Sequence, residues 1–99
     1  DPRAAPAAAT PLAVEFPLAG ARIVIPVEMS GERGSIVARA HHRDARSRLY
    51  WHLDGAFLGV TTGAHTMEMA PPPGDRRLVV VDEAGHSATI AFEVLETDP

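Results

Sequence analysis

The side chains in this sequence that could do chemistry are its histidines, serines and carboxylates. Imidazole binds metals and titrates near neutral pH, so a metal or proton-relay site is the first hypothesis to test. The spacing does not favour it, because adjacent histidines on a strand face opposite sides and no His-x-x-x-His or His-Glu-x-x-His motif is present. We therefore expect surface or turn-capping histidines and no bound metal. The histidines are His41, His42, His52, His65 and His86.

Nucleophilic and glycosidase chemistry are also disfavoured. No serine lies in a Gly-x-Ser-x-Gly motif, which would expose a nucleophile on a strand-to-helix turn. Asp54, Asp82 and Glu83 could be imagined as a glycosidase carboxylate pair, but aspartates beside turn glycines usually stabilise hairpins through backbone hydrogen bonds. The sequence therefore predicts a domain that is not an enzyme and needs no cofactor. Its serines are Ser30, Ser35, Ser47 and Ser87.

The composition excludes several classes of protein. The formal net charge is −4, and all nine basic residues are arginines scattered among acidic ones, which argues against nucleic-acid binding. The absence of cysteine excludes disulfides and thiolate metal sites. No apolar stretch reaches the roughly 20 residues that span a bilayer, so this domain is not expected to insert into a membrane.

The chain divides into a linker and one domain. Residues 1–11 are rich in alanine and proline and predict a linker. Residues 12–99 contain short apolar runs about every ten residues, separated by Gly, Pro and Asp, a spacing typical of an all-β sandwich. We predict an immunoglobulin-like or fibronectin type III-like antiparallel sandwich of about seven strands. The runs are residues 13–16, 22–25, 35–41, 49–54, 56–61, 65–69, 76–82 and 87–95.

Alternation within the runs predicts which residues form the core. Leu49, Trp51 and Leu53 alternate with polar residues, so the single tryptophan should face inward. Ile90, Phe92 and Val94 repeat the pattern in the last run. The unbroken run at residues 78–81 predicts a central strand covered on both faces. Met67 and Met69 alternate with Glu68 and are assigned to the core, although methionine also suits adaptable binding surfaces.

Turn residues predict how the runs connect. Asp54-Gly55 and the stretch at residues 82–85 each place a glycine where a hairpin needs a positive φ angle. Both predict antiparallel neighbours. Residues 71–73 are prolines, which cannot donate ladder hydrogen bonds, so they should cross between sheets. Pro17 and Pro26 flank a run that should be a short edge strand.

The candidate binding residues are two aromatics and a basic loop. Tyr50 should be exposed because Trp51 faces inward, and Phe57 follows in the next run. Exposed aromatic rings could stack on sugars. Arg43, Arg46 and Arg48 could bind carboxylates or phosphates, although a solvated charged loop is the simpler interpretation.

The chain combines an opening with Pro17 and Gly20, a hairpin at residues 50–55 and a closing hairpin at residues 82–85. In this order these motifs resemble the C-terminal domain of penicillin-binding protein 1C. Residues 16–94 carry the resemblance, with one departure, Arg76 where the family often has His. The motifs are Pro17, Gly20 and Ile23 in the opening, Tyr50, Trp51, Leu53, Asp54 and Gly55 in a hairpin, Pro73 and Gly74 before a strand, and Asp82 and Gly85 in the closing hairpin.

The resemblance implies a parent protein that is a periplasmic, membrane-anchored bifunctional peptidoglycan synthase, with glycosyltransferase and transpeptidase domains preceding this one. A chain without lysine cannot contain the Ser-x-x-Lys or Lys-Thr-Gly motifs of such transpeptidases, so catalysis is expected upstream. Three roles remain for this domain. It could dock a periplasmic protein or its own parent chain through a sheet edge or end loops, bind peptidoglycan in a groove, or act as a structural spacer.

Overall fold

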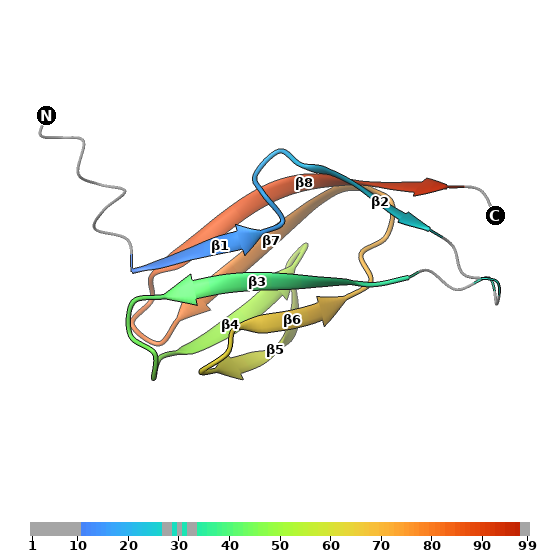
Figure 1. Ribbon diagram of the computed structural model, residues 1–99. Helices are drawn as coiled ribbons and strands as arrows, with labels where there is room; N and C mark the ends of the chain where they lie inside the picture. Colours follow the sequence, from blue (N-terminus) through green and yellow to red (C-terminus); the bar gives the residue numbers. More distant parts are fainter. Residues whose placement is uncertain (1–10, 27–28, 30, 32–33, 98–99) are drawn as a thin grey trace, which may run out of the picture.

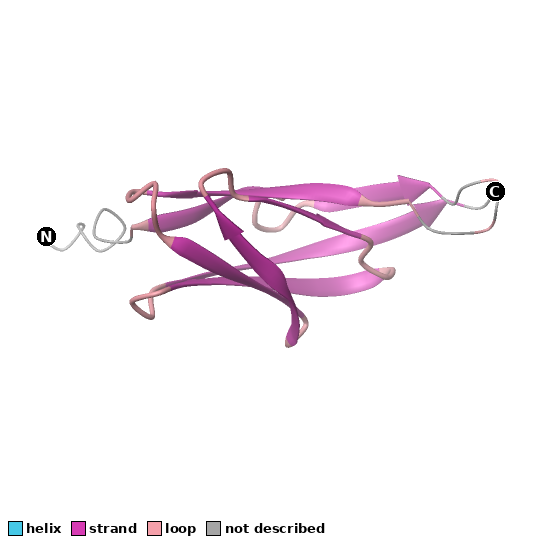
Figure 2. Ribbon diagram, turned by 90° about the horizontal axis from the view of Figure 1, so that it is seen from below, coloured by secondary structure: helices cyan, strands magenta, loops and turns pink. Residues whose placement is uncertain are grey.

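The computed structural model describes residues 11–26, 29, 31 and 34–97, and these residues form two β-sheets packed face to face (Figures 1 and 2). The predicted linker lies outside the described residues except for Pro11, and so does Ser30. The described part of the chain has eight strands and no helix. They are β1 (Leu12–Phe16), β2 (Arg22–Pro26), β3 (Ile36–His42), β4 (Arg48–Leu53), β5 (Ala56–Thr62), β6 (Thr66–Met69), β7 (Gly74–Asp82) and β8 (Ser87–Thr97).

The strand order confirms the predicted sandwich and adds one detail. One sheet has the order β1-β3-β6, and the other has the order β2-β8-β7-β4-β5. All neighbours are antiparallel except β2 and β8, which run parallel. The parallel pair arises because the chain leaves the first sheet after β1, turns at residues 18–20 and joins the edge of the second sheet as β2. The predicted edge strand is therefore confirmed.

The turns follow their sequence signals. Asp54 and Gly55 have φ angles of 51° and 85°, as the tight β4–β5 hairpin requires. Asp82 and His86 close the β7–β8 hairpin, where the Asp82 N–H donates to the His86 carbonyl at 2.9 Å. The prolines at residues 71–73 connect β6 in one sheet to β7 in the other, as predicted.

The core lies between the sheets and contains the predicted inward residues. Trp51, Leu49, Leu78 and Val80 are fully buried, and Met69 is buried against them. Phe92 and Val94 are also buried, Ile90 and Met67 pack at the edge of this cluster, and Leu12, Ile25, Ala38 and Ala40 complete it. Burial of this apolar surface is the main favourable term in folding.

One sequence prediction about β7 was only half right. β7 is central in its sheet, and Leu78 and Val80 face the core. Val79 and Val81 face the other way and are only half-buried, because the second sheet covers one face of β7 and no described segment forms a layer over the other. The apolar run is therefore partly displayed on the outer face of the five-stranded sheet.

Candidate functional site

The outer face of the five-stranded sheet carries two adjacent rows of mostly apolar side chains. In the first row Tyr50 on β4 lies between Val60 on β5 and Val81 on β7. In the second row His52 lies between Phe57 and Val79. Directly opposed residues share a face of a sheet, so these side chains form one contiguous patch. We call it the outer-face patch, and its members are Tyr50, His52, Phe57, Val60, Val79 and Val81.

The outer-face patch is most exposed where it meets the free edge of the sheet. Phe57 is 58% exposed and Val60 45% exposed. The His52 and Phe57 ring centroids lie 5.5 Å apart at a tilt of 57°, within the range of favourable ring contacts. A bulge between Trp51 and His52 shifts the register, so that Gly59 pairs with Trp51 while Phe57 pairs with His52. This shift places Phe57 and Val60 on the same face.

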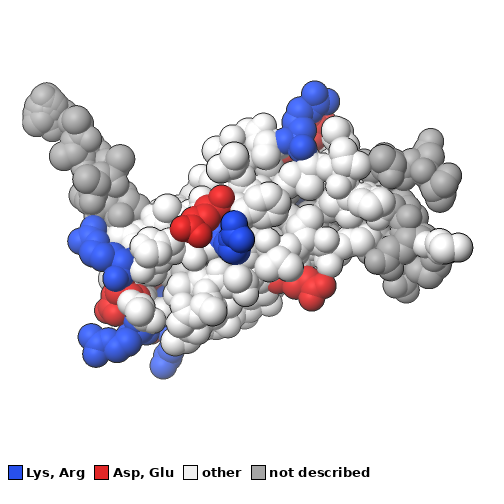
Figure 3. Space-filling view, viewed as in Figure 1, with Lys and Arg blue, Asp and Glu red and all other residues white. Residues whose placement is uncertain are grey.

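The structure brings some of the predicted binding residues together. Tyr50 and Phe57 are both in the outer-face patch, and Arg48 begins the same strand as Tyr50. Arg43 and Arg46 lie in the β3–β4 loop instead, where the Arg43 N–H donates to the Pro11 carbonyl at 2.8 Å. Figure 3 shows arginine side chains gathered at this end of the molecule. Aspartate and glutamate partners accompany them, with Arg46–Asp44 at 3.6 Å and Arg48–Glu83 at 3.5 Å.

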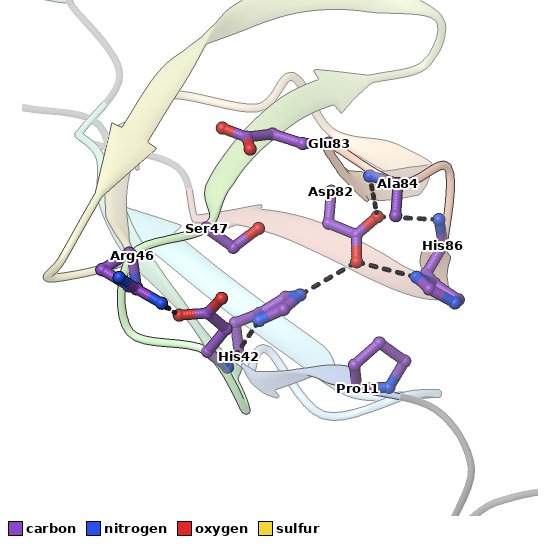
Figure 4. Close-up of a pocket in the computed structure, with 9 residues that line it drawn as sticks. Pro11, His42, Arg46, Ser47, Asp82, Glu83, Ala84 and His86 are labelled. Carbon is purple, nitrogen blue, oxygen red and sulfur yellow. Dashed lines mark hydrogen bonds and ion pairs between the residues drawn. The ribbon is translucent and has the colours of Figure 1, made fainter.

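A second polar cluster lies at the same end and is shown in Figure 4. The His42 and His86 rings approach Oδ2 of Asp82 at 2.9 Å and 3.0 Å. Oδ1 of Asp82 accepts the backbone N–H groups of Ala84 and His86 at 2.9 Å and 2.8 Å. The cluster borders a shallow hollow of about 480 Å³, which Arg46 and Ser47 also line. It joins the end of β3 to the β7–β8 hairpin.

The hydrogen bonds of this cluster determine what His42 can do. Nδ1 of His42 accepts the Asp44 N–H at 2.9 Å, so the neutral ring carries its proton on Nε2 and donates it to Asp82. Both ring nitrogens are thus engaged, and the ring is largely buried. His42 therefore holds the β3–β4 corner against the hairpin and has no free nitrogen for proton transfer. Ser47, which lines the same hollow, donates to the Arg48 carbonyl at 3.3 Å.

A buried polar chain links β4 to the β5–β6 connection. The Trp51 indole N–H donates to Thr61 Oγ1 at 2.8 Å, and Thr61 Oγ1 lies 2.8 Å from His65 Nδ1. Burial lowers the pKa of His65 below its ordinary value, and the neighbouring His42 and His41 add to this. The chain satisfies the indole N–H within the core, which explains how the single tryptophan can be fully buried.

The described residues provide neither a metal site nor a membrane-spanning helix. No group of three or more histidine or acidic side chains among them has a geometry that could hold a metal ion. Within the same part of the chain, no helix is long and apolar enough to cross a membrane.

Comparison with known proteins identifies the family. Residues 1–92 match the model of the Penicillin-Binding Protein C-terminus family, which covers most of the chain. The chain belongs to this family. The predicted resemblance to a penicillin-binding protein C-terminal domain is thereby confirmed, and membership of this family indicates a protein of the cell envelope. A search of curated proteins finds no match.

A solved structure supports the fold assignment of this Penicillin-Binding Protein C-terminus domain. The structure is described as "Structures of Clostridium thermocellum CbhA fibronectin(III)-like modules" and has a TM-score of 0.66. It is 13% identical, and the alignment covers 88% of this chain and 99% of that chain. At this identity the similarity shows a shared fibronectin type III-like sandwich and nothing about ligands.

Sequence reasoning missed the Asp82 cluster and four of the six residues of the outer-face patch, because only Tyr50 and Phe57 were proposed as binding residues. The sequence predicted that Asp82 stabilises its own turn, and its Oδ1 does accept a backbone N–H there. Its Oδ2 contacts His42, which lies 40 residues away, and no local signal connects these two residues. The signals for the patch were present but indirect. They are the unbroken apolar run at residues 78–81 and the absence of any charged residue in β5.

The Asp82 cluster predicts a loss of stability in acid. Burial alone would raise the pKa of Asp82, but hydrogen bonds from the His42 ring and from the backbone and ring of His86 outweigh it and lower the pKa to about 2. The Asp82 carboxylate therefore binds a proton more readily in the unfolded chain than in the folded one. Asp82 contributes about 2 kcal/mol to the free energy of unfolding above pH 4, and this contribution is lost as the pH falls towards 2. Urea unfolding of the wild type and of Asp82→Asn at pH 5 and pH 2 measures this. An equal decrease in both proteins would contradict the assignment to Asp82.

Proposed function

We propose that this domain is a non-catalytic docking module of a penicillin-binding protein, and that it binds a protein surface through the outer-face patch. The observation that carries the proposal is the contiguous exposure of Phe57, Val60 and their neighbours on a sheet face with no covering layer among the described residues. Contiguous exposed apolar patches on small domains mark interaction sites.

The free edge beside the outer-face patch supports the same function. β5 has the sequence AFLGVTT, without a charged residue or a proline. Edge strands are usually protected against pairing by charges, prolines or short length. β2, at the opposite edge, has such protection in Arg22 and Pro26. An unprotected edge next to an apolar face is suited to contact with another protein.

The proposed docking role assigns catalysis to other domains of a penicillin-binding protein. Penicillin-binding transpeptidases use lysine-containing motifs, and this chain has no lysine. We place the chemistry of peptidoglycan synthesis in other parts of the parent and this domain in the periplasm, where it would attach the parent to a protein partner or brace its other domains.

Peptidoglycan binding is the second candidate, because Tyr50 and Phe57 lie in one patch. Sugar sites need aromatic faces together with converging polar groups. Here Tyr50 is half-buried between Val60 and Val81, and the described neighbours on this face are mostly valines. This composition favours a protein surface over a glycan.

A matched pair of variants tests the proposed function. Val60 in the outer-face patch and Val37 on the outside of the other sheet are 45% and 52% exposed. We expect Val60→Asp to abolish capture of a binding protein from envelope extract, because it puts a charge in the interface, and Val37→Asp to leave capture unchanged. Mass spectrometry of the retained protein and sedimentation with peptidoglycan sacculi provide the readout. If the wild type sediments with sacculi and Val60→Asp does not, the outer-face patch binds a glycan and not a protein. If both variants capture the same protein equally well, the outer-face patch is not the binding surface.

A further inference from the structure

The charges at the two ends of the outer-face patch have a regular arrangement. At one end Arg48 of β4 lies beside Glu83, which follows β7, with Nε and Oε2 3.5 Å apart. At the other end Asp54, which follows β4, lies beside Arg77 of β7, whose backbone N–H it accepts at 2.9 Å. Among the described residues the Arg77 guanidinium has no ion-pair partner. Each of the two strands therefore carries opposite charges at its two ends.

The strand register places the apolar rows midway between these charges. Along β4 the order on the outer face is Arg48, Tyr50, His52 and Asp54, and along β7 it is Glu83, Val81, Val79 and Arg77. Arg48 and Asp54 are about 20 Å apart at 3.3 Å per residue, too far to pair within one molecule. Within one molecule Arg48 pairs with Glu83 at 3.5 Å and Asp54 pairs with Arg76 at 2.8 Å, so Arg77 is the one charge of the four at the patch ends without an ion-pair partner among the described residues. The two ends of the outer-face patch can therefore meet charges of opposite sign at the far ends of a neighbouring patch.

We propose that the outer-face patch binds the same patch on a second copy of this domain, with a two-fold axis that crosses the strands between the two apolar rows. This rotation places Arg48 over Asp54 of the second copy and Glu83 over Arg77 of the second copy. It also places Val60 over Phe57 and Val81 over Val79. The proposal rests on the proposed docking function and names its partner.

The symmetry, the spacing of the sheets and the placement of the charges are compatible with this dimer. A two-fold interface is self-complementary, so every contact occurs twice. Stacked sheets lie about 10 Å apart, a gap that valine and phenylalanine side chains from both faces fill and that an arginine and a carboxylate span. The charges lie at the rim, where they determine orientation more than affinity, and the apolar rows supply the attraction.

A different two-fold axis can be distinguished from this one. An axis along the strands, between β4 and β7, would also pair opposite charges, but with Arg77 over Asp54 of the second copy. It would place Phe57 and Val60 over the strand next to β7, where the outward residues are Thr89 and Ser87. The axis across the strands is favoured because it covers the two most exposed apolar side chains of the patch with each other.

Sedimentation equilibrium of the 99-residue chain over a range of concentrations tests the proposal. We expect a concentration-dependent dimer that Val60→Asp converts to monomer and Val37→Asp leaves intact. A monomer at all concentrations, or a dimer indifferent to Val60→Asp, would overturn it. If the chain stays monomeric while Val60→Asp still abolishes capture of an envelope protein, the docking function stands and the second copy is excluded.

Charge exchange tests the alignment. Arg77→Glu and Glu83→Arg should each weaken dimerisation about tenfold, because each places like charges over one another. The double variant R77E/E83R should restore affinity to within about threefold of the wild type, since the two exchanged side chains again face each other across the axis with opposite charges. An axis along the strands predicts that the double variant dimerises more weakly than either single variant. That result would overturn the proposed alignment. Circular dichroism of each variant confirms that it is folded.

Discussion

Asp82→Ala is expected to lower the free energy of unfolding by about 3 kcal/mol, a large part of the stability of a domain of this size. The variant removes the acceptor of the His42 Nε2–H, which is buried and has no other partner among the described residues. It also releases the backbone N–H groups of Ala84 and His86, which hold the β7–β8 hairpin. Urea unfolding at pH 7 followed by circular dichroism measures the effect.

Two comparisons make this result specific to the cluster. Asp75 is an exposed aspartate on the same strand as Asp82, and Asp75→Ala should change stability by less than about 0.5 kcal/mol. Asp82→Asn keeps the shape and one oxygen but presents an amide N–H₂ or a single oxygen to two histidines, so we expect an intermediate loss. If Asp82→Ala and Asp75→Ala were equally mild, His42 would not depend on Asp82 and the cluster would have no structural role.

Trp51→Ala is expected to destabilise the domain by about 3–5 kcal/mol. Trp51 is fully buried in the middle of the core, and its removal leaves a cavity bordered by side chains such as Leu49 and Val80. The indole N–H that Thr61 accepts is lost at the same time. Because this is the only tryptophan, unfolding of the variant must be followed by circular dichroism.

The phenylalanine variant separates the two contributions of Trp51. Trp51→Phe retains most of the packing but removes the donor to Thr61, so we expect a loss of about 1–2 kcal/mol. Val37→Ala, at a side chain that is 52% exposed, provides the surface reference and should stay within about 0.5 kcal/mol of the wild type. A Trp51→Ala effect no larger than that of Val37→Ala would show that the core does not depend on the indole.

The outer-face patch links binding by this domain to the way its central strand is covered. Val79 and Val81 alternate with the core residues Leu78 and Val80 on β7, so a central strand that is apolar on both faces is only half covered by its own domain. A second copy on the outer face would supply the missing layer. The same reasoning explains why Val60→Asp should impair binding with little effect on folding, since Val60 is already 45% exposed in the single domain.

Much of the fold could be predicted from the sequence because its signals are local. Alternation depends only on neighbouring residues, and it correctly placed Trp51, Phe92 and Val94 in the core. Turn chemistry is equally local, so Asp54-Gly55 predicted a hairpin where one is found. The prolines at residues 71–73 predicted the crossing between sheets for the same reason, because a residue without an N–H cannot continue a ladder.

The candidate sites required the tertiary structure because they depend on which strands become neighbours. The order β8-β7-β4-β5 and its register place Val79, His52 and Phe57 in one row, and the bulge after Trp51 decides on which face Phe57 lies. His42 and Asp82 meet only because β3 ends beside the β7–β8 hairpin. The sequence by itself determined which residues face inward in the alternating strands and where the chain turns. Long-range strand pairing decided which outward residues stand together, because register is set by packing of the whole sandwich and leaves no trace in the spacing of any single segment.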